Sequence, residues 1–383
     1  MIQAPATLAL LGGGQLGRFF VAAAHELGYR VIVVDPDAHC PAGQIAAEHL
    51  IAHYDDVTAL DHLMHHCSAA TTEFENVPAL TLAQLATRMP VYPSSDAVAI
   101  AQDRILEKSF LRDNGFITAP FATIVSLEDC AAIEEAFFPA ILKIARLGYD
   151  GKGQARVNSV AQAQQAFRDF NEQPCVLEQR LALDLEISVV LARTVSGECA
   201  TFAVAENSHR NGILDISIAP ARISETLRSQ AEITAQEVAQ RLNYVGVLAI
   251  EFFICGTSLL INELAPRPHN SGHHTIDSCI TNQFEQQLRA LCDLPLGSAQ
   301  HHSAAVMVNL LGDLWYGEDS LTLREPDWSQ LTQHPNLKLH LYGKEEPRPG
   351  RKMGHFTVVD STIESALATA LTARRAIGVA DSP

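Results

Sequence analysis

Two glutamates bracket a short hairpin pattern late in the chain. Residues 251–263 read Glu-Phe-Phe-Ile-Cys-Gly-Thr-Ser-Leu-Leu-Ile-Asn-Glu, which is two apolar strands joined by Gly256-Thr257. If the turn has three central residues, the register places Glu251 opposite Glu263, with the carboxylates roughly 5 Å apart. Like charges this close in a half-buried sheet need a proton or a cation between them. Because Asn262 adds an oxygen of the kind that hard cations prefer, the pattern predicts a divalent-metal site.

This prediction depends on the geometry of the turn. A two-residue turn would shift the pairing by one residue and place Glu251 and Glu263 on opposite faces of the hairpin. For an isolated pair of acids, the solvated face of a sheet is also a commoner location than a metal site. The metal interpretation therefore needs support from other motifs.

A glycine-rich loop at residues 146–154 reads Arg-Leu-Gly-Tyr-Asp-Gly-Lys-Gly-Gln and follows an apolar strand that contains Lys143. A lysine among buried strand residues needs an anionic partner. Lys152 is bracketed by glycines and could close over a triphosphate as a mobile point charge. The alternative for Gly-Lys-Gly is the solvated tip of a hairpin, and one motif alone does not decide between them.

A third segment lies just beyond this loop, where the strand pattern at 176–178 continues into Gln179-Arg180-Leu181. Its backbone groups could meet the edge of a base, and Glu186 on the next strand pattern could bind ribose hydroxyls. Taken alone, the segment is equally typical of an ordinary edge strand. Its position after the glycine-rich loop is what favours a nucleotide site.

Near the amino terminus, a Gly-Gly-Gly-Gln-Leu-Gly segment at 12–17 lies between the strand pattern Thr7–Leu11 and a helical stretch that ends at Leu27. Glycines let backbone N–H groups and a helix N-terminus approach a phosphate. With Asp35 after the second strand, the pattern could also serve a dinucleotide. Three consecutive glycines suit a tight strand-to-helix turn equally well. We expect a phosphate or ligand contact here, and not a nicotinamide cofactor.

Composition limits the classes of function. At 383 residues, of which 47% are hydrophobic, the chain is expected to form two or three domains. The net charge of -17 argues against binding to nucleic acid or an anionic membrane, so a phosphorylated small molecule would need local basic clusters. The eight cysteines show no C-x-x-C spacing, which favours reduced thiols in a cytosolic protein. With neither a signal-peptide pattern nor a long apolar run, we expect a cytoplasmic location.

The order of strand and helix patterns predicts the fold class. Strands and helices alternate up to about residue 100, which predicts a Rossmann-like parallel sheet with helices on both faces. Later strands look antiparallel, so we expect an α/β fold that becomes α+β. The expected domains are 1–103, 104–175 and 176–383. The patterns behind this division are helices at Leu60–His66, Leu80–Ala86 and Glu225–Leu242, and strands at Val31–Val34, Ala69–Glu73, Ala140–Ile144, Gln154–Val157, Val176–Glu178, Ile187–Ala192 and Ala200–Val204.

A strand lysine, a glycine-rich loop, a Glu-Gln-x-x-Leu connector and a hairpin ending in Asn-Glu follow one another in the order found in the ATP-grasp superfamily, which this sequence resembles. Within that superfamily it is similar to the carboxyaminoimidazole ribonucleotide synthases, ATP-dependent carboxylases of purine biosynthesis. The resemblance rests on Gly-Gly-Gln-Leu-Gly-Arg at 13–18, Thr-Glu-Phe-Glu-Asn at 72–76, Gly-Tyr-Asp-Gly-Lys-Gly-Gln at 148–154, Glu-Asn-Ser-His at 206–209, Asn-Glu-Leu-Ala-Pro-Arg-Pro-His-Asn-Ser-Gly-His at 262–273 and Arg-Pro-Gly-Arg-Lys-Met-Gly-His at 348–355.

The resemblance implies an ATP-grasp fold with an N-terminal Rossmann-like domain, a small lid domain and a mixed or antiparallel C-terminal domain. It implies a homodimer, with ATP as co-substrate and two Mg²⁺ ions that Mn²⁺ could replace. The implied reaction converts aminoimidazole ribonucleotide, bicarbonate and ATP to the N-carboxylated ribonucleotide, ADP and phosphate through carboxyphosphate.

The same resemblance assigns roles to individual residues. Glu251 and Glu263 would hold the metal, with Asn262 alongside. The implied ATP contacts are Arg104, Lys143, Gly148, Tyr149, Asp150, Gly151, Lys152, Gly153, Gln154, Glu178, Gln179, Arg180, Leu181, Glu186 and His209. The implied ribonucleotide contacts are Gln15, Leu16, Glu73, Tyr149 and Asp150, with Arg267, Lys344, Arg351 and Lys352 around the 5'-phosphate. His269 and Asn270 would position bicarbonate or the amine, and the implied catalytic set is Tyr149, Asp150, Lys152, Arg267, His269 and Asn270.

Three other functions remain open at this point. A nicotinamide-dependent oxidoreductase would use the first glycine loop but would leave the two-glutamate hairpin and Lys143 without a task. A nucleotide sensor would bind ATP without turnover, and a formate-dependent glycinamide ribonucleotide transformylase would phosphorylate formate. Zinc is not expected at His62, His65 and His66, because no carboxylate or cysteine completes the set.

Overall fold

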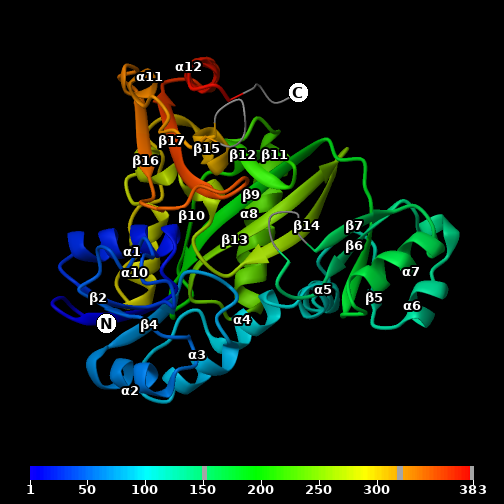
Figure 1. Ribbon diagram of the computed structural model, residues 1–383, viewed down its shortest axis with the longest axis horizontal. Coiled ribbons are helices and arrows are strands. Elements are labelled where there is room, and N and C mark those ends of the chain that lie inside the picture. Colours follow the sequence, from blue (N-terminus) through cyan, green and yellow to red (C-terminus); the bar gives the residue numbers. More distant parts are fainter. Residues whose placement is uncertain (149–152, 317–321, 380–383) are drawn as a thin grey trace.

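The computed structural model describes residues 1–148, 153–316 and 322–379, which form three β-sheets with helices around them (Figure 1). The first sheet is parallel, with its strands in the order β3-β2-β1-β4. Its elements are β1 (Thr7–Leu11), α1 (Gln15–Glu26), β2 (Arg30–Val34), β3 (Glu48–Leu50), α2 (Val57–His66), β4 (Ala69–Thr72), α3 (Ala79–Leu85) and α4 (Ser95–Ala101).

Alternate residues of β1 face two different hydrophobic clusters. Leu8 and Leu10 pack with α1 and with α10 (Gln283–Leu291), which comes from much later in the chain. Ala9 and Leu11 pack with α2 and α3 on the other face. A parallel sheet covered on both faces is the arrangement predicted from the sequence, and that prediction is confirmed.

The second sheet is small and antiparallel, in the order β5-β8-β6-β7, and lies with α6 and α7 at one end of the molecule (Figure 1). Its elements are β5 (Phe121–Ile124), α6 (Leu127–Ala131), β6 (Ala140–Ile144), β7 (Gln154–Val157), α7 (Val160–Asp169) and β8 (Cys175–Gln179). We had expected the Val176–Glu178 strand to begin the third domain. It instead pairs with both β5 and β6, because Leu177 packs in the core of this sheet, so the expected boundary at 175/176 cuts through β8.

The third sheet is antiparallel and has nine strands in the order β14-β13-β9-β11-β12-β15-β17-β16, with β10 beside β9. These strands are β9 (Leu185–Arg193), β10 (Cys199–Thr201), β11 (Ala205–Arg210), β12 (Ile213–Ala219), β13 (Gly246–Cys255), β14 (Ser258–Ala265), β15 (Ala304–Leu311), β16 (Leu337–Leu341) and β17 (Lys352–Asp360). The strand expected at Ala200–Val204 therefore ends early, at Thr201. Helix α8 (Glu225–Arg241) covers β9 and β13, and α12 (Ile363–Ala376) covers β15 and β17.

Many helices begin at a residue whose side chain accepts a backbone N–H of the first turn, which satisfies donors that the helix leaves unpaired. The N-caps of this kind are Asp56, Ser94, Asp103, Ser126, Ser159, Ser224, Asn282 and Thr362. Other helical segments of the described chain are α5 (Arg104–Asp113), α9 (Thr275–Ser278), α11 (Ser329–Thr332) and 3-10 turns at Glu135–Phe137, Asn270–Gly272 and Gly312–Trp315. Within the described residues, no helix is long and apolar enough to cross a membrane.

The β13–β14 hairpin pairs Glu251 with Glu263, as expected, but by a different route. The turn contains only two residues, Gly256 and Thr257, and such a turn alone would put the two acids on opposite faces. The register shifts next to Glu251, where Asn262 is the extra residue of a β-bulge. The bulge restores the pairing, so the assumption of a three-residue turn was wrong and the predicted pair is confirmed.

Two consecutive residues of α5 hold this bulge. The Lys108 ammonium donates to the Asn262 carbonyl oxygen at 2.8 Å, and the Glu107 carboxylate accepts the Leu264 N–H. Lys108 is 0% exposed and Glu107 is 1% exposed. Burial raises the pKa of Glu107 to about 8 and lowers that of Lys108. The backbone on each side of Glu263 is therefore fixed by a buried side chain.

We predict that Lys108→Met lowers the free energy of unfolding by about 2–3 kcal/mol, because the Asn262 carbonyl loses its donor and Glu178 loses a cation 3.5 Å away. Urea unfolding followed by circular dichroism measures the change. Lys338→Met, at an exposed position of β16, is the matched control and should change stability by less than about 0.5 kcal/mol. Equal effects of the two substitutions would show that Lys108 does not stabilise the bulge.

Candidate active site

A cavity of about 830 Å³ is lined by residues of the second and third sheets, and by residues of α1 and of the loops that follow the strands of the first sheet. All of the sequence-predicted site residues that the structure describes line this cavity. They are Gln15, Leu16, Glu73, Arg104, Lys143, Gly148, Gly153, Gln154, Glu178, Gln179, Arg180, Leu181, Glu186, His209, Glu251, Asn262, Glu263, Arg267, His269, Asn270, Lys344, Arg351 and Lys352. Tyr149, Asp150, Gly151 and Lys152 lie outside the described residues.

The paired glutamates lie in one wall of the cavity. Burial raises the pKa of Glu251, and the adjacent Glu263 carboxylate raises it further. Burial acts on Glu263 in the same direction, but Arg104, 3.1 Å away, and Lys143 outweigh it, and the pKa of Glu263 is lowered. Burial and the repulsion between the two carboxylates thus oppose ionisation of both at once. This behaviour is expected for two carboxylates that bind a cation together.

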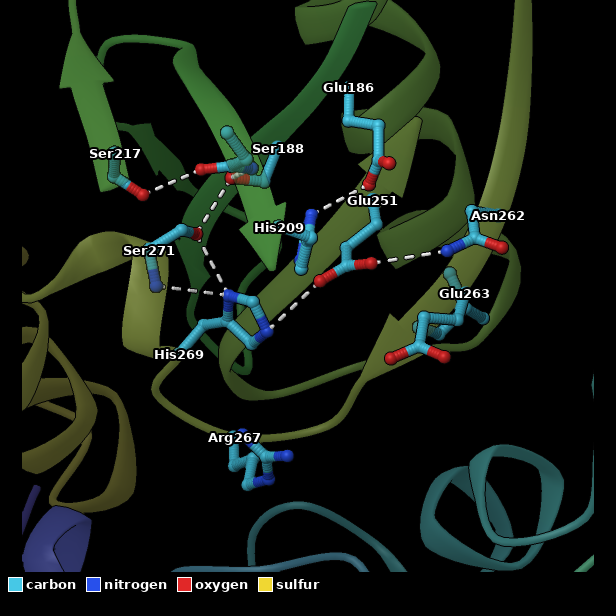
Figure 2. Close-up of polar contacts among 12 residues, drawn as sticks. Glu186, Ser188, His209, Ser217, Glu251, Asn262, Glu263, Arg267, His269 and Ser271 are labelled. Atoms are coloured by element: carbon cyan, nitrogen blue, oxygen red, sulfur yellow. Dashed lines mark hydrogen bonds and ion pairs between the residues drawn. The ribbon is translucent and has the colours of Figure 1, made fainter. Parts of the chain in front are cut away.

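Asn262 lies beside the same pair. Its side-chain amide donates to Glu251 at 3.1 Å, while its side-chain oxygen is buried without a hydrogen-bond partner (Figure 2). Two carboxylates and an unsatisfied amide oxygen form a donor set that suits Mg²⁺ or Mn²⁺. The residues present therefore fit a hard divalent cation.

Other basic side chains that line the cavity are already paired with carboxylates. The Lys143 ammonium lies 2.7 Å from Glu178, which is the anionic partner that a strand lysine requires. Burial raises the pKa of Glu178, but Lys143 and Lys108 outweigh it and lower the value to about 2. On the neighbouring strands, His209 and Glu186 approach to 2.8 Å; burial lowers the pKa of His209, but this contact outweighs burial and raises it.

Arg267 and His269 follow β14 and face the same cavity. The Arg267 guanidinium donates to Glu75, a residue from the loop after β4, and so connects the third sheet to the first domain. Burial raises the pKa of Glu75, but Arg267 outweighs it and lowers the value to about 2. Burial and the charge of Arg267 lower the pKa of His269 to about 3, so its imidazole is neutral at pH 7. Its Nε2 lies 3.4 Å from Glu251 (Figure 2).

The first glycine loop binds carboxylates of the chain itself. The N–H groups of Gly14 and Gly17 donate to Glu73 at 2.6 and 3.0 Å. The Gly13 N–H donates to Asp35, which also accepts the Tyr54 hydroxyl. Glu73 therefore already accepts from the amides at the start of α1, and the expected phosphate or ligand contact of this loop stays a prediction. Asp35, which a dinucleotide would need, is also buried and already accepts the hydrogen bonds from Gly13 and Tyr54.

The late basic segment lines the cavity from the loop between β16 and β17. The Lys344 ammonium donates to the Lys352 carbonyl at 2.7 Å, and the Arg351 guanidinium donates to the Glu346 carbonyl at 2.7 Å. Gln44 of the first domain donates to the Gly343 carbonyl at 3.0 Å and holds this loop beside the first sheet. In a chain of net charge -17, these residues form the local basic cluster that a phosphorylated ligand needs.

The histidine groups do not form a convincing second metal site. His62 contacts Glu48 at 3.1 Å and stacks on His66. Among the described residues, Asp277, His340 and His355 bring possible ligand atoms within 4.8 Å of one another. The His340 and His355 rings, however, stack with an interplanar angle of 20°, so their ring nitrogens lie in nearly parallel planes and do not converge on one ion.

Sequence reasoning missed several residues that support the site. Glu107 and Lys108 received no role, and Glu75, Asn207 and Ser271 were quoted within motifs without one. Ser188 and Ser217 went unnoticed, although each is a polar residue in an apolar strand pattern. That contrast is a signal that could have identified these two serines.

Comparisons with known proteins agree with this geometry. Family models match as the ribonucleotide synthetase preATP-grasp domain at residues 6–102, the ATP-grasp domain at 109–284 and the phosphoribosylaminoimidazole carboxylase C-terminal domain at 305–369. The N5-carboxyaminoimidazole ribonucleotide synthase of Brucella melitensis is 44% identical over 356 residues, which cover 92% of this chain and 95% of that protein.

Solved structures give the same result. An ADP complex of an N5-carboxyaminoimidazole ribonucleotide synthetase matches with a TM-score of 0.90 and 40% identity over 97% of both chains. The N5-carboxyaminoimidazole synthase of Aspergillus clavatus, in complex with ADP and 5-aminoimidazole ribonucleotide, matches with a TM-score of 0.85 and 28% identity over 97% of this chain and 98% of that one. With all three domain models in order and near-complete coverage by relatives of the same name, this chain belongs to the N5-carboxyaminoimidazole ribonucleotide synthase family of ATP-grasp enzymes.

Proposed function

We propose that this protein catalyses the ATP-dependent carboxylation of 5-aminoimidazole ribonucleotide by bicarbonate, giving N5-carboxyaminoimidazole ribonucleotide, ADP and phosphate. One observation carries the proposal beyond family membership. A single cavity contains both the Glu251–Glu263 pair and the basic cluster of Lys344, Arg351 and Lys352. The first set suits a metal-bound triphosphate, and the second suits the phosphate of another substrate.

The chemistry explains why both sets are needed together. Bicarbonate is a poor electrophile, and transfer of the ATP γ-phosphoryl group to one of its oxygens gives carboxyphosphate and ADP. Carboxyphosphate then releases carbon dioxide and phosphate, and the amine of the ribonucleotide forms the new C–N bond as it loses a proton. Both substrates must lie in the same enclosed space, because carboxyphosphate is lost if it meets water first.

Magnesium is part of this proposal. Glu251 and Glu263 would hold it, with the side-chain oxygen of Asn262 alongside. When bound, the ion supplies positive charge to the phosphoryl oxygens during transfer. Two Mg²⁺ ions, replaceable by Mn²⁺, are the stoichiometry that the family resemblance implies.

The remaining roles follow from position in the cavity. Arg104 and Lys143 would neutralise ATP phosphates, the connector around Glu178 and Leu181 would meet adenine, and Glu186 would bind ribose hydroxyls. Because Glu263 and Glu178 already orient the two cations, little reorganisation is needed when ATP enters.

The ribonucleotide would lie toward the first domain, against Gln15, Leu16 and Glu73. Arg267, His269 and Asn270 would lie between the two substrates, beside bicarbonate. The contacts of Tyr149, Asp150, Gly151 and Lys152, the homodimer and the cytoplasmic location remain predictions.

The direct test is an ADP-release assay with defined substrates. We expect ADP formation to require both Mg²⁺ and 5-aminoimidazole ribonucleotide, and label from bicarbonate to enter the product. The control reaction replaces these substrates with formate and glycinamide ribonucleotide, where we expect no turnover. Turnover with that pair and none with bicarbonate would assign the chain to a different acid substrate.

We predict that Glu263→Gln lowers turnover about a hundredfold, which corresponds to roughly 3 kcal/mol, because a charged metal contact is lost while the side-chain shape is kept. The Mg²⁺ concentration for half-maximal rate should rise, and the protein should still unfold cooperatively. The control is Glu237→Gln at an exposed position of α8. Near-normal turnover of Glu263→Gln would rule out the paired-carboxylate metal site.

We predict that Arg351→Ala raises the Michaelis constant for the ribonucleotide about thirtyfold, or roughly 2 kcal/mol, through loss of a charge-assisted phosphate contact. The Michaelis constant for ATP should stay within about threefold, because ATP binds at the other end of the cavity. Arg348→Ala is the matched control, since Arg348 pairs with Glu346 outside the cavity lining. If Arg351→Ala instead raised the Michaelis constant for ATP and left that for the ribonucleotide unchanged, the assignment of the two ends would be reversed.

A further inference from the structure

A row of polar side chains crosses the third sheet beside the acidic pair. In the strand pairing, Glu251 lies opposite Glu263 on one side and opposite Ser188 on the other. Asn207 lies opposite Ser217 in the same way. These side chains therefore share one face of five neighbouring strands. Ser188 is 1%, Asn207 5% and Ser217 0% exposed. Buried polar groups in an apolar sheet are unfavourable unless they are hydrogen-bonded, which makes the pattern of their bonds informative.

These side chains form one continuous chain of hydrogen bonds. The Ser217 hydroxyl donates to the Asn207 side-chain oxygen at 2.6 Å, and the Asn207 amide donates to the Ser188 hydroxyl at 2.9 Å. The Ser188 and Ser271 hydroxyls are 2.7 Å apart, and Ser271 lies 2.8 Å from Nδ1 of His269. With the Ser188 oxygen accepting from Asn207, its proton is directed to Ser271, and the Ser271 proton is directed to His269.

A second donor fixes the direction at the histidine independently. The backbone N–H of Ser271 also donates to Nδ1 of His269, at 3.3 Å (Figure 2). A backbone N–H can only donate, so Nδ1 is an acceptor and has no proton. The neutral ring therefore has its proton on Nε2, the nitrogen 3.4 Å from the Glu251 carboxylate.

We propose that Asn207, Ser188 and Ser271 are positioning residues that hold His269 as the Nε2–H tautomer, so that its ring acts as a hydrogen-bond donor toward Glu251 and the anionic acid substrate. An imidazole lone pair at this place would repel a carboxylate or bicarbonate oxygen, whereas an N–H stabilises it. His269 is then not the base that takes the proton of the amine, because Nε2 is already protonated and Nδ1 faces Ser271. The identity of the group that accepts from His269 rests on the proposed function. The assignment of the tautomer does not rest on it.

The test reverses the direction of the hydrogen bonds along this row and keeps the shape of the side chains. In Asn207→Asp the new carboxylate can only accept, so the Ser188 hydroxyl turns toward it and Ser271 turns toward Ser188. The Ser271 oxygen is then left to accept a proton from Nδ1. The Ser271 N–H still favours an unprotonated Nδ1 in this variant. We therefore expect part of the His269 population to shift to the Nδ1–H tautomer and turnover to fall in proportion, about twofold if half of the population shifts. Michaelis constants for ATP and ribonucleotide should stay within about threefold.

Ser217→Ala is the matched control. It removes a buried hydrogen bond from the same row but leaves the donation from Asn207 to Ser188 in place. We expect a loss of stability similar to that of Asn207→Asp, with the tautomer and turnover unchanged. A merely structural role of the row would instead give both variants the same turnover.

Long-range ¹H–¹⁵N correlation spectra of the ring nitrogens, recorded without substrate or metal, measure the tautomer. His269 is assigned as the signal missing from His269→Gln. A wild-type ring protonated on Nδ1, or on both nitrogens at pH 7, overturns the inference even if no other variant folds. An unchanged tautomer in Asn207→Asp overturns the roles of Asn207 and Ser188, and a changed tautomer with normal turnover overturns the donor role of the ring. If bicarbonate is not a substrate but the Nε2–H tautomer is observed, the proposed function fails and the tautomer assignment stands.

Discussion

Electrostatic repulsion between two partly buried carboxylates is the constraint around which the site is organised. Glu251 and Glu263 are brought together by a bulge in one hairpin, and the charge of Glu263 raises the pKa of Glu251. Much of the surrounding polar structure stabilises the two carboxylates in this unfavourable contact. Arg104 neutralises one carboxylate, while the side chains of α5 prevent the bulge from relaxing into a regular register that would separate the pair. The Mg²⁺ proposed for this site would relieve that repulsion.

The same principle applies to the cavity as a whole. Several basic side chains of the cavity already have an anionic partner from a different part of the chain, such as Lys143 with Glu178 and Arg267 with Glu75, whereas Lys344 and Arg351 donate to backbone carbonyls. Fixed partners orient these side chains before a ligand arrives and limit the desolvation that ligand binding would otherwise require. An acidic protein can in this way maintain a site for two phosphorylated substrates without a broadly positive surface.

Sequence patterns predicted the elements better than the connections among them. The strands at Thr7–Leu11 and Ala140–Ile144 were found at those residues, because an apolar run bounded by glycine or proline is a local signal. The bulge at Asn262 gives no such signal. The pairing of the two glutamates was predicted correctly, but from an assumed three-residue turn that the structure does not have. Lys108 appears in the sequence as an ordinary charged helix residue, since its partners lie at least 70 positions away. Motif order gave the residues that line the cavity, but the occupation of the glycine-loop amides by Glu73 depends on a tertiary contact.

The contact between Arg267 and Glu75 links substrate chemistry to the integrity of the whole molecule. Arg267 extends from the sheet that holds Glu251 and Glu263, yet the carboxylate that orients it belongs to the first domain. A chain in which the first domain is not docked would retain the acidic pair but would leave this arginine without the partner that orients it. The lining of the cavity is thus complete only when the domains are assembled.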